Sequence, residues 1–166
     1  QADVTAPVSG LLGRFVLDVV ESPSSGIELP GVRAGRIDVT DDGDGVGEVL
    51  VTMLRDAGVD ARLVSSVAPD ASGVVFLGGL RRVADVDQAV AVNREAFAAA
   101  RAVAGSPSLF VTVTALGGGF GCDGDDPIAA WTGGLTALAR TAALEWPGAG
   151  VKAIDVARGS SGGTAR

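Results

Sequence analysis

The fold is decided by the stretch Asp126-Pro127-Ile128-Ala129-Ala130-Trp131-Thr132-Gly133-Gly134-Leu135-Thr136-Ala137-Leu138-Ala139-Arg140-Thr141-Ala142-Ala143-Leu144-Glu145-Trp146-Pro147, with an apolar run at residues 151–156 after it. Apolar residues at steps of three and four predict a single stripe along a helix of about five turns: Trp131, Leu135, Leu138, Ala142 and Trp146. Asp126 is expected as the N-cap with Pro127 in the first turn, and Pro147 ends the helix because proline cannot continue one. The run at 151–156 predicts a strand in a sheet on which the stripe packs.

Upstream of this stretch, strand-like and helix-like segments alternate. Strands are expected at residues 37–40, 61–67, 73–79 and 108–116 from their apolar and β-branched content. Helices are expected from Val46 to a glycine C-cap at Gly58, and at residues 85–104. The spacing predicts inner faces made of Val46, Val49, Leu50, Met53, Leu54 and Ala57 in the first helix and of Val86, Val90, Asn93, Phe97, Ala100 and Ala104 in the second. The alternation predicts an α/β fold with a mostly parallel sheet and helices on both faces.

The connection between the strands expected at 61–67 and 73–79 is short. Roughly six residues separate them, whereas a parallel crossover normally contains a helix, so we expect a shortened sheet. The folded domain is expected over residues 14–157, with a linker at 1–13 and a flexible tail or linker at 158–166. Residues 14–20 precede the alternating unit, so we expect them to form a strand at the edge of the sheet or detached from it.

Composition argues against several kinds of partner. The net charge is −7 and the 13 basic residues, of which Lys152 is the only lysine, are scattered, so no nucleic-acid partner is expected. No run is long and apolar enough for a membrane span, and we expect a cytoplasmic protein without a membrane partner. Cys122 is the only cysteine and the chain has no histidine to act as its base, so Cys122 is expected to be a structural or loop thiol.

A longer pattern carries a resemblance. Residues 133–147, Gly-Gly-Leu-Thr-Ala-Leu-Ala-Arg-Thr-Ala-Ala-Leu-Glu-Trp-Pro, are followed by Val-Lys-Ala-Ile-Asp-Val at 151–156. This pattern resembles the ketoreductase region of iterative type I polyketide and polyunsaturated fatty acid synthases, and more distantly the short-chain dehydrogenase/reductase fold. The resemblance covers residues 37–159 and implies a truncated Rossmann-like fold. Such ketoreductases consist of a non-catalytic structural subdomain and a catalytic subdomain that holds NADPH.

The catalytic positions that the resemblance implies are altered in this chain. The Tyr-x-x-x-Lys pair of the family falls on Ile128 and Thr132, and the family's serine falls near Thr114. Asn93 matches the asparagine that supports the proton relay, and we expect it to tie its helix to the backbone as a relic. The chain contains no tyrosine, so no phenol can donate a proton to a carbonyl. We therefore expect no catalytic residue in this chain.

The phosphate-binding turn that the resemblance implies is altered as well. The family has Thr-Gly-x-x-x-Gly-x-Gly; Thr40, Gly45 and Gly47 match, whereas Asp41 stands in place of the first glycine. Three carboxylates, those of Asp41, Asp42 and Asp44, crowd the turn, and we expect them to satisfy the helix N-terminus themselves. We therefore expect no cofactor here, with NADPH bound in the catalytic subdomain.

The resemblance favours a structural subdomain whose partner is the catalytic ketoreductase subdomain of the same synthase, with an acyl carrier protein as an indirect partner. Two other functions stay open: a free-standing reductase with unusual chemistry, and a small-molecule or carrier-protein binding module. A phosphoacceptor receiver domain shares the acidic pair after the first strand, but it needs an aspartate at the end of the middle strand, and residues 74–80 have none. The acids Asp123, Asp125 and Asp126 lack the regular alternation of a calcium loop, so we expect a solvated loop with an N-cap.

Overall fold

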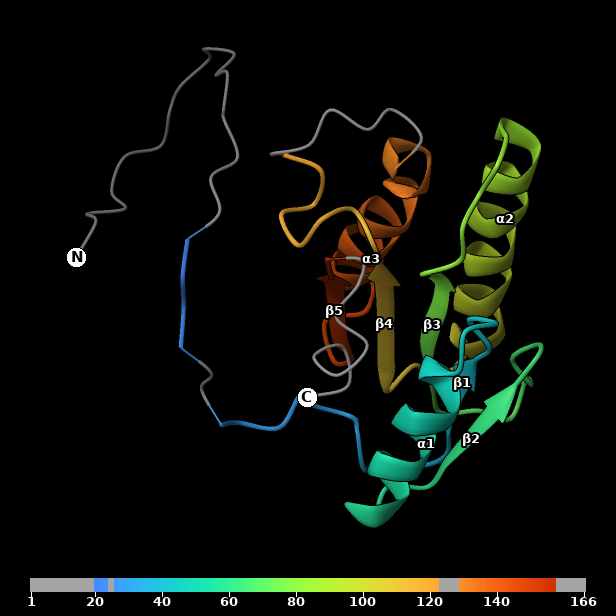
Figure 1. The fold of residues 1–166 in the computed structure, drawn as a ribbon. Coiled ribbons are helices and arrows are strands. Elements are labelled where there is room, and N and C mark those ends of the chain that lie inside the picture. Colours follow the sequence, from blue (N-terminus) through green and yellow to red (C-terminus); the bar gives the residue numbers. More distant parts are fainter. Residues whose placement is uncertain (1–19, 24–25, 123–128, 158–166) are drawn as a thin grey trace, which may run out of the picture.

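The computed structural model describes residues 20–23, 26–122 and 129–157, which form a five-stranded sheet with helices on both faces (Figure 1). The strands are β1 (Ile37–Thr40), β2 (Ala61–Val64), β3 (Gly73–Gly79), β4 (Leu109–Thr114) and β5 (Gly150–Asp155). Their order is β2-β1-β3-β4-β5, and every neighbouring pair is parallel. The predicted α/β fold with a parallel sheet is confirmed, and it is Rossmann-like.

The helices divide between the two faces of the sheet. Helix α1 (Val46–Asp56) lies over β1 and β2, whereas α2 (Val86–Val103) lies on the opposite face against β3. The 3₁₀ helix η1 (Ala129–Thr132) and α3 (Gly134–Glu145) share the face of α2, with α3 against β4 and β5. Strands covered on both faces carry apolar side chains on both: Val39 belongs to the core under α1, and Phe110 to the core under α2 and α3. The Phe110 ring meets the Trp146 ring edge-on, with centroids 5.8 Å apart.

The connection from β2 to β3 crosses β1 without a helix, as its length predicts. Asp38, which is fully buried on β1, holds this connection in place. Its carboxylate accepts hydrogen bonds from Arg62 on β2, at 2.7 Å from Nε and 3.2 Å from Nη2, and from the Ala68 N–H at 2.9 Å. Arg36 contacts Asp38 at 3.4 Å and also forms an ion pair with Asp70. Charged contacts therefore anchor a crossover that lacks the apolar face of a helix.

The long helix predicted from Asp126 to Trp146 is wrong over the described residues that precede Gly134. In the described part of this stretch, the chain forms η1, turns at Gly133 and begins α3 at Gly134. A Cβ at Gly134 would lie 2.3 Å from Asn93 Oδ1, so the glycine allows α3 to begin in close contact with α2. The stripe is kept from Leu135 to Trp146, whereas the predicted N-cap Asp126 and the following Pro127 lie outside the described residues.

The predicted inner faces of α1 and α2 are partly wrong. On α1, Val49 and Met53 are exposed, and the buried residues are Gly47 and Val51. On α2, the predicted Val86, Val90 and Phe97 are exposed, and the buried side chains are mostly small: Ala89, Val92, Ala96, Ala99, Ala100 and Val103. Alanine side chains let a helix lie close to a sheet, so the short residues occupy the interface and the larger apolar ones face outward.

The ends of the chain lie largely outside the described residues. This holds for the predicted linker at 1–13, most of the strand predicted at 14–20, and the tail at 158–166. Val20 is described, lies in no strand and is 74% exposed. A Cβ at Gly150 would lie 1.8 Å from the carbonyl oxygen of Pro30, so the backbone at Pro30 packs closely against the start of β5. No described helix combines the length and the apolar character needed to cross a membrane.

Candidate functional site

One buried carboxylate closes the turn between β1 and α1. Asp42 is 2% exposed, its Oδ1 accepts a hydrogen bond from the Gly47 N–H at 2.8 Å, and its Oδ2 accepts one from the Asp44 N–H at 3.1 Å. Gly47 lies in the first turn of α1, where free N–H groups would face a phosphate in a dinucleotide-binding turn. The Asp42 carboxylate thus binds the helix end at which a nucleotide phosphate would otherwise bind.

The residues that match the family's phosphate pattern also have local structural roles. Gly45 is the N-cap of α1 with a φ of 89°, a left-handed conformation that favours glycine. At Gly47, a Cβ would lie 2.6 Å from Leu63 Cδ1, so glycine allows α1 to pack closely on β2. The Thr40 hydroxyl accepts a hydrogen bond from the Leu77 N–H at 2.8 Å and so links β1 to β3. Contacts inside the protein therefore account for all three matches without a bound nucleotide.

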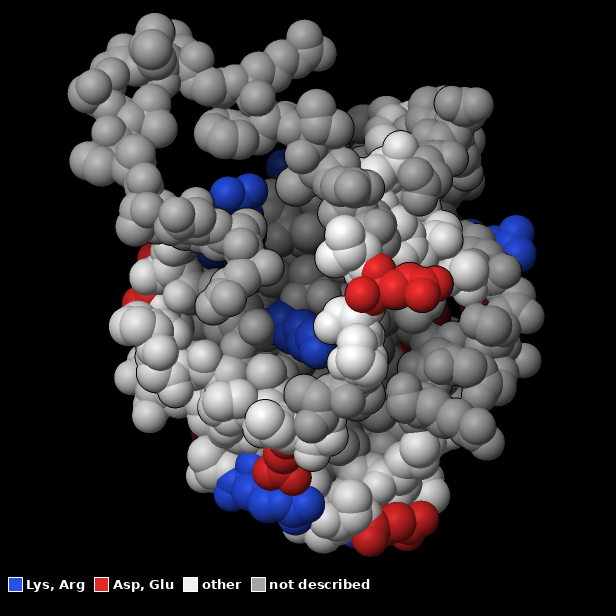
Figure 2. Space-filling view, turned by 90° about the vertical axis from the view of Figure 1, so that its left-hand side faces the viewer, with Lys and Arg blue, Asp and Glu red and all other residues white. Residues whose placement is uncertain are grey.

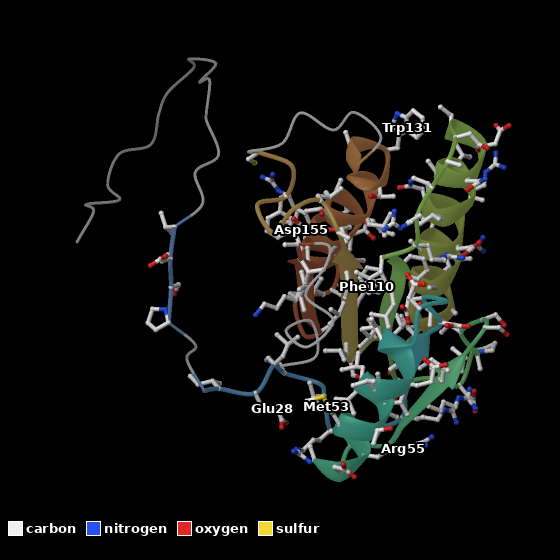
Figure 3. The ribbon with its side chains drawn as sticks, viewed as in Figure 1. Glu28, Met53, Arg55, Phe110, Trp131 and Asp155 are labelled. Carbon is white, nitrogen blue, oxygen red and sulfur yellow. The ribbon has the colours of Figure 1, made fainter. Side chains whose placement is uncertain are left out.

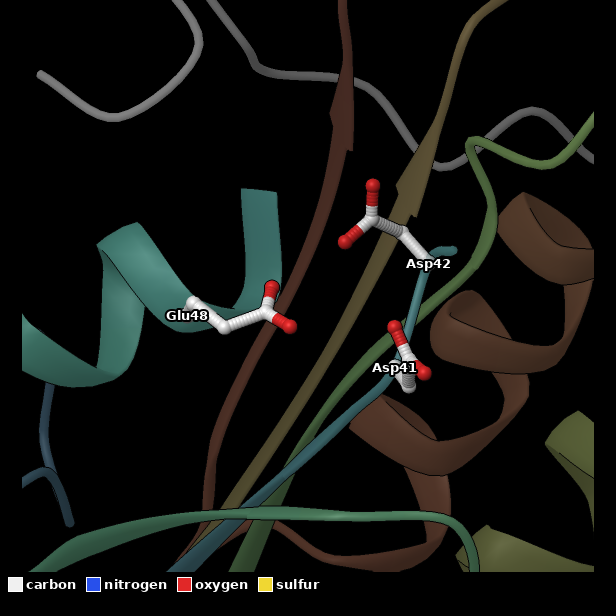
Figure 4. Close-up of side chains that lie close together, drawn as sticks. All are labelled: Asp41, Asp42 and Glu48. Carbon is white, nitrogen blue, oxygen red and sulfur yellow. The ribbon is translucent and has the colours of Figure 1, made fainter. Parts of the chain in front are cut away.

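Asp41, Asp42 and Glu48 come together at this turn (Figure 4). Each offers a carboxylate oxygen, and these oxygens lie within 4.8 Å of one another. Asp41, which stands in place of the family's first glycine, lies at the exposed rim, and its Oδ1 accepts the Gly43 N–H at 2.8 Å. Both oxygens of Asp42 already accept backbone hydrogen bonds. Of the three acids, Asp42 is therefore the one that bonds to the helix end, and Asp42 rather than Asp41 occupies the turn.

A cavity of about 360 Å³ lies beside the turn, at the carboxyl ends of β1 and β2. Open α/β sheets bind ligands outside the carboxyl ends of their strands where the strand order reverses, which here is between β1 and β3. The cavity is lined by Asp41, Ser65, Ser66 and Arg81, with Phe76 among its apolar residues. Arg81 also forms an ion pair with Glu95, another lining residue, so its charge is compensated within the protein. The described lining suits a polar, uncharged group better than a pyrophosphate.

The described residues at the family's relay positions make packing and backbone contacts. Asn93 Nδ2 donates to the carbonyl oxygens of Ala89 at 2.8 Å and Trp131 at 3.1 Å, so it ties α2 to η1 as the structural interpretation predicts. Thr132, at the family's lysine position, is 4% exposed, whereas Ile128, at the tyrosine position, lies outside the described residues. Lys152 lies on β5 and is exposed.

Sequence reasoning misses Asp155, which organises the loop after β4 (Figure 3). Its Oδ1 accepts hydrogen bonds from the Thr114 hydroxyl at 2.8 Å and the Leu116 N–H at 2.7 Å. Its Oδ2 accepts the N–H groups of Gly118 and Phe120, both at 2.8 Å. Phe120 has a φ of 55°, which is uncommon outside glycine, and the bond to Asp155 helps to hold it there. The sequence offered one indication of this role: Asp155 ends its strand, and the glycine-rich loop follows the neighbouring strand at the same edge of the sheet.

The charges around Asp38 were missed as well. Burial by itself raises the pKa of Asp38, but the Arg62 hydrogen bond, the Ala68 N–H and the attraction of both arginines outweigh it, and the net pKa lies below its ordinary value. The hydrogen bond to Asp38 raises the pKa of Arg62. The hydrogen bond between Arg36 and Asp70 raises the pKa of the first and lowers the pKa of the second. All four groups are therefore charged at neutral pH and act on the crossover.

On the face shown in Figure 2, the described charged side chains lie in a few separate places among uncharged residues, and at the lower edge of the view cations and carboxylates lie against each other. No protein-family model matches this chain, and no curated protein matches it. The residues of the chain itself therefore indicate its function, above all Asp42 at the N-terminal end of α1 and the described residues at the relay positions.

Proposed function

We propose that this chain is a non-catalytic structural subdomain that supports the NADPH-dependent catalytic half of a β-ketoacyl reductase in an iterative type I polyketide or fatty acid synthase. The single observation that carries the proposal is the Asp42 carboxylate, which accepts the Gly47 N–H at the helix end where a nucleotide phosphate would dock. The ordered resemblance over residues 37–159 supplies the family in which such a subdomain occurs.

NADPH does not fit this turn. A pyrophosphate there would approach the Asp42 carboxylate, and two unit charges ~4 Å apart repel by about 1 kcal/mol in water and about 4 kcal/mol at an effective dielectric of 20. The attraction of an exposed helix end for an anion is only about 0.3–1 kcal/mol. At the effective dielectric of 20 the repulsion exceeds the attraction, and one such contact weakens binding by roughly tenfold or more.

Proton transfer to a ketone also lacks its donor. The sequence contains no tyrosine. Thr114, near the family's serine position, has its hydroxyl engaged by Asp155. The remaining match, Asn93, contacts the backbone of its own helix and of η1. A reductase needs a positioned hydride donor and proton donor together, so these contacts favour a supporting role.

Titration of the full chain with NADPH tests the cofactor part of the proposal. Calorimetry is expected to show no saturable binding up to about 1 mM, a concentration that corresponds to ~4 kcal/mol of binding free energy. A low-micromolar dissociation constant that is abolished by Gly45→Val or Gly47→Val would contradict the proposal. The same titration of Asp42→Ala, which removes the internal anion, shows whether the carboxylate is what excludes the nucleotide.

The supporting role is tested in the parent gene. A sequence after Arg166 that encodes a new strand, a Gly-x-x-x-Gly-x-Gly turn and a later Tyr-x-x-x-Lys pair would support the proposal. The catalytic segment expressed with residues 1–166 should reduce a β-ketoacyl thioester with NADPH. The catalytic segment expressed alone should be at least about tenfold less active. A catalytic segment that is fully active and equally soluble without this chain would refute the supporting role.

A second candidate, a small-molecule or carrier-protein binding module, is favoured by the cavity of about 360 Å³ beside the turn. Uncharged polyols and nucleosides are suitable probes because Ser65 and Ser66 line the cavity. A saturable rise in melting temperature that is lost in Ser66→Leu would support this candidate. The absence of any shift, together with an acyl carrier protein that also gives none, would leave the structural subdomain as the better proposal.

A further inference from the structure

A hollow of about 240 Å³ lies on the face of the sheet that carries α1. Of the described helices only α1 lies on this face, and it packs over β1 and β2 at one side of the sheet (Figure 1). The side chains around the hollow are all apolar, among them Leu50 on α1, Val111 on β4 and Ile154 on β5. The described linings of this hollow and of the cavity beside the turn after β1 share no residue. We call this second cavity the sheet hollow.

The turn at residues 29–32 forms one wall of the sheet hollow. Leu29 and Val32 line the hollow from this turn. Between them, a Cβ at Gly31 would lie 1.8 Å from the carbonyl oxygen of Ser108, directly before β4. Backbone atoms therefore meet closely enough to fix the turn against the start of β4. The hollow is enclosed by this turn, by α1 and by the sheet, so it is part of the packed fold.

The size and lining of the sheet hollow favour an apolar ligand. Close-packed protein interiors contain few voids larger than a water molecule. A buried water needs two to four polar partners, and none of the described side chains around this hollow has a polar atom. An engineered apolar cavity of about 150 Å³ in another protein stays dry and binds benzene. We therefore expect an aliphatic or aromatic group in the sheet hollow.

The sheet hollow opens toward β5, which is the edge strand of the sheet. Ile154 on β5 lines the hollow and is 38% exposed. Val111 and Val113 on the neighbouring strand β4 also line it, and each is only 6% exposed. A ligand would therefore enter past Ile154 and place its apolar end over β4 and toward α1.

A lysine stands beside this opening. Lys152 is two residues from Ile154 on β5, so the two side chains share one face of the sheet, whereas Ala153 between them packs into the core under α2 and α3. In the sheet register Lys152 lies next to Val111, whose side chain lines the hollow. Lys152 is exposed, and within the described part of the chain it forms no ion pair. A cation is therefore available at the opening of an apolar hollow.

We propose that the sheet hollow binds a fatty acid, with the aliphatic chain over β4 and the carboxylate at Lys152. The proposal goes beyond the supporting role described above and does not depend on it. An apolar cavity with a single charged group at its opening suits a ligand with an aliphatic chain and one anionic end. The net charge of −7 disfavours non-specific binding of anions, so a carboxylate gains affinity only where a cation faces it.

Methyl NMR of the full chain, titrated with decanoate below its micelle concentration, tests the site. The methyl signals of Leu50, Val111 and Ile154 are expected to shift and to saturate at one decanoate per chain. Those of Val92 and Leu135, which belong to the core on the opposite face of the sheet, are expected to stay unchanged. No saturable shift up to about 1 mM, or equal shifts in both cores, would overturn the proposal.

The two ends of the ligand are tested separately. Each methylene added between octanoate and decanoate is expected to tighten binding about three- to fourfold, because it enters an apolar site. Decanoate is expected to bind about two- to fivefold more tightly than decanol, which has the same chain without the charge. Decylamine is expected to bind more weakly than decanol, because Lys152 repels it. An affinity that does not depend on chain length, or decanol that binds as tightly as decanoate, would overturn the assignment of a fatty acid.

Variants at the opening test the residues. Lys152→Met is expected to weaken decanoate binding about two- to fivefold and to leave decanol binding unchanged, whereas Lys152→Arg keeps the charge and should keep the affinity. Ile154→Glu is expected to weaken decanoate binding at least about tenfold, because it replaces an apolar contact with a like charge. Val49→Glu is the matched control, since Val49 is 52% exposed on α1 and does not line the hollow. Far-UV circular dichroism verifies that the variants fold.

The variants also define the results that contradict the proposal. Equal effects of Ile154→Glu and Val49→Glu, or a Lys152→Met variant that binds decanoate as tightly as the wild type, would overturn it. A chain that binds no fatty acid would leave the supporting role of the subdomain intact, because that role is measured with the catalytic segment.

Discussion

Replacement of Asp42 by alanine tests whether the turn after β1 is locked by the protein's own carboxylate. The substitution removes the acceptor of the Gly47 N–H and of the Asp44 N–H. Gly47 is buried, so its N–H would lose its partner in a place that water reaches poorly. Asp44 is exposed, and its N–H can bind water instead.

The expected cost follows from these two contacts. A hydrogen bond to a charged group contributes about 1.5–3 kcal/mol, and the loss of a side-chain cap at a helix N-terminus costs about 0.5–2 kcal/mol. We expect Asp42→Ala to lower the free energy of unfolding by about 2–4 kcal/mol, mostly through Gly47. At ~2–4 °C per kcal/mol for a domain of this size, the melting temperature should fall by about 5–15 °C. Asp42→Asn keeps an acceptor oxygen without the charge and should cost about half as much.

Urea unfolding followed by far-UV circular dichroism measures these differences. Asp41→Ala is the matched control, because Asp41 is a neighbouring exposed acid whose Oδ1 accepts the Gly43 N–H. It should cost no more than about 1 kcal/mol. If Asp42→Ala is no more destabilising than Asp41→Ala, the carboxylate does not lock the turn, and the main support for a turn closed to phosphate is lost.

The other buried contacts predict their own outcomes. The folded-state pKa of Asp38 lies below its ordinary value, so its contribution to stability is present above about pH 4 and lost as the pH falls through the folded pKa. Urea midpoints should drop below that pH, and Arg62→Met should reduce this acid-dependent loss; identical profiles would contradict the ion pair. Gly150→Ala should cost about 1–3 kcal/mol because its Cβ meets a backbone oxygen, whereas Gly148→Ala, with open space around it, should cost less than about 0.5 kcal/mol; equal unfolding energies would be evidence against the close approach. Asp155→Ala should speed amide hydrogen exchange in the loop at residues 116–120 at least about tenfold, and an unchanged loop would show that these bonds do not hold it.

The chain of elements could be read from local sequence. The strands at residues 37–40 and 73–79 and the first helix are found within a residue or two of their predicted limits, because apolar periodicity and glycine caps act over only a few neighbours. The spacing between the second and third strands also predicts the crossover without a helix. The parallel sheet follows from the same alternation, since strands separated by helices return in the same direction.

The identity of the buried acid could not be read in this way. Asp41, Asp42 and Asp44 are chemically alike and adjacent, and the path of the backbone through Gly43 and Gly45 is what turns Asp42 inward to the helix end. Asp155 and its loop partners are separated by 35 to 39 residues in sequence, and only the parallel pairing of β4 with β5 brings them to one edge.

The burial of helix residues likewise depends both on local sequence and on contacts between distant elements. Val90 and Phe97 are apolar and regularly spaced on α2, yet both side chains are exposed. The alanines of α2 are buried instead, because their short side chains fit the narrow space against β3. A sequence pattern indicates that a helix has apolar residues on one side. The space between the helix and the sheet decides which of these residues are buried. Residues on other elements, such as Phe76 and Phe110, occupy part of this space. The space is therefore defined only after the sheet and the helices have packed together.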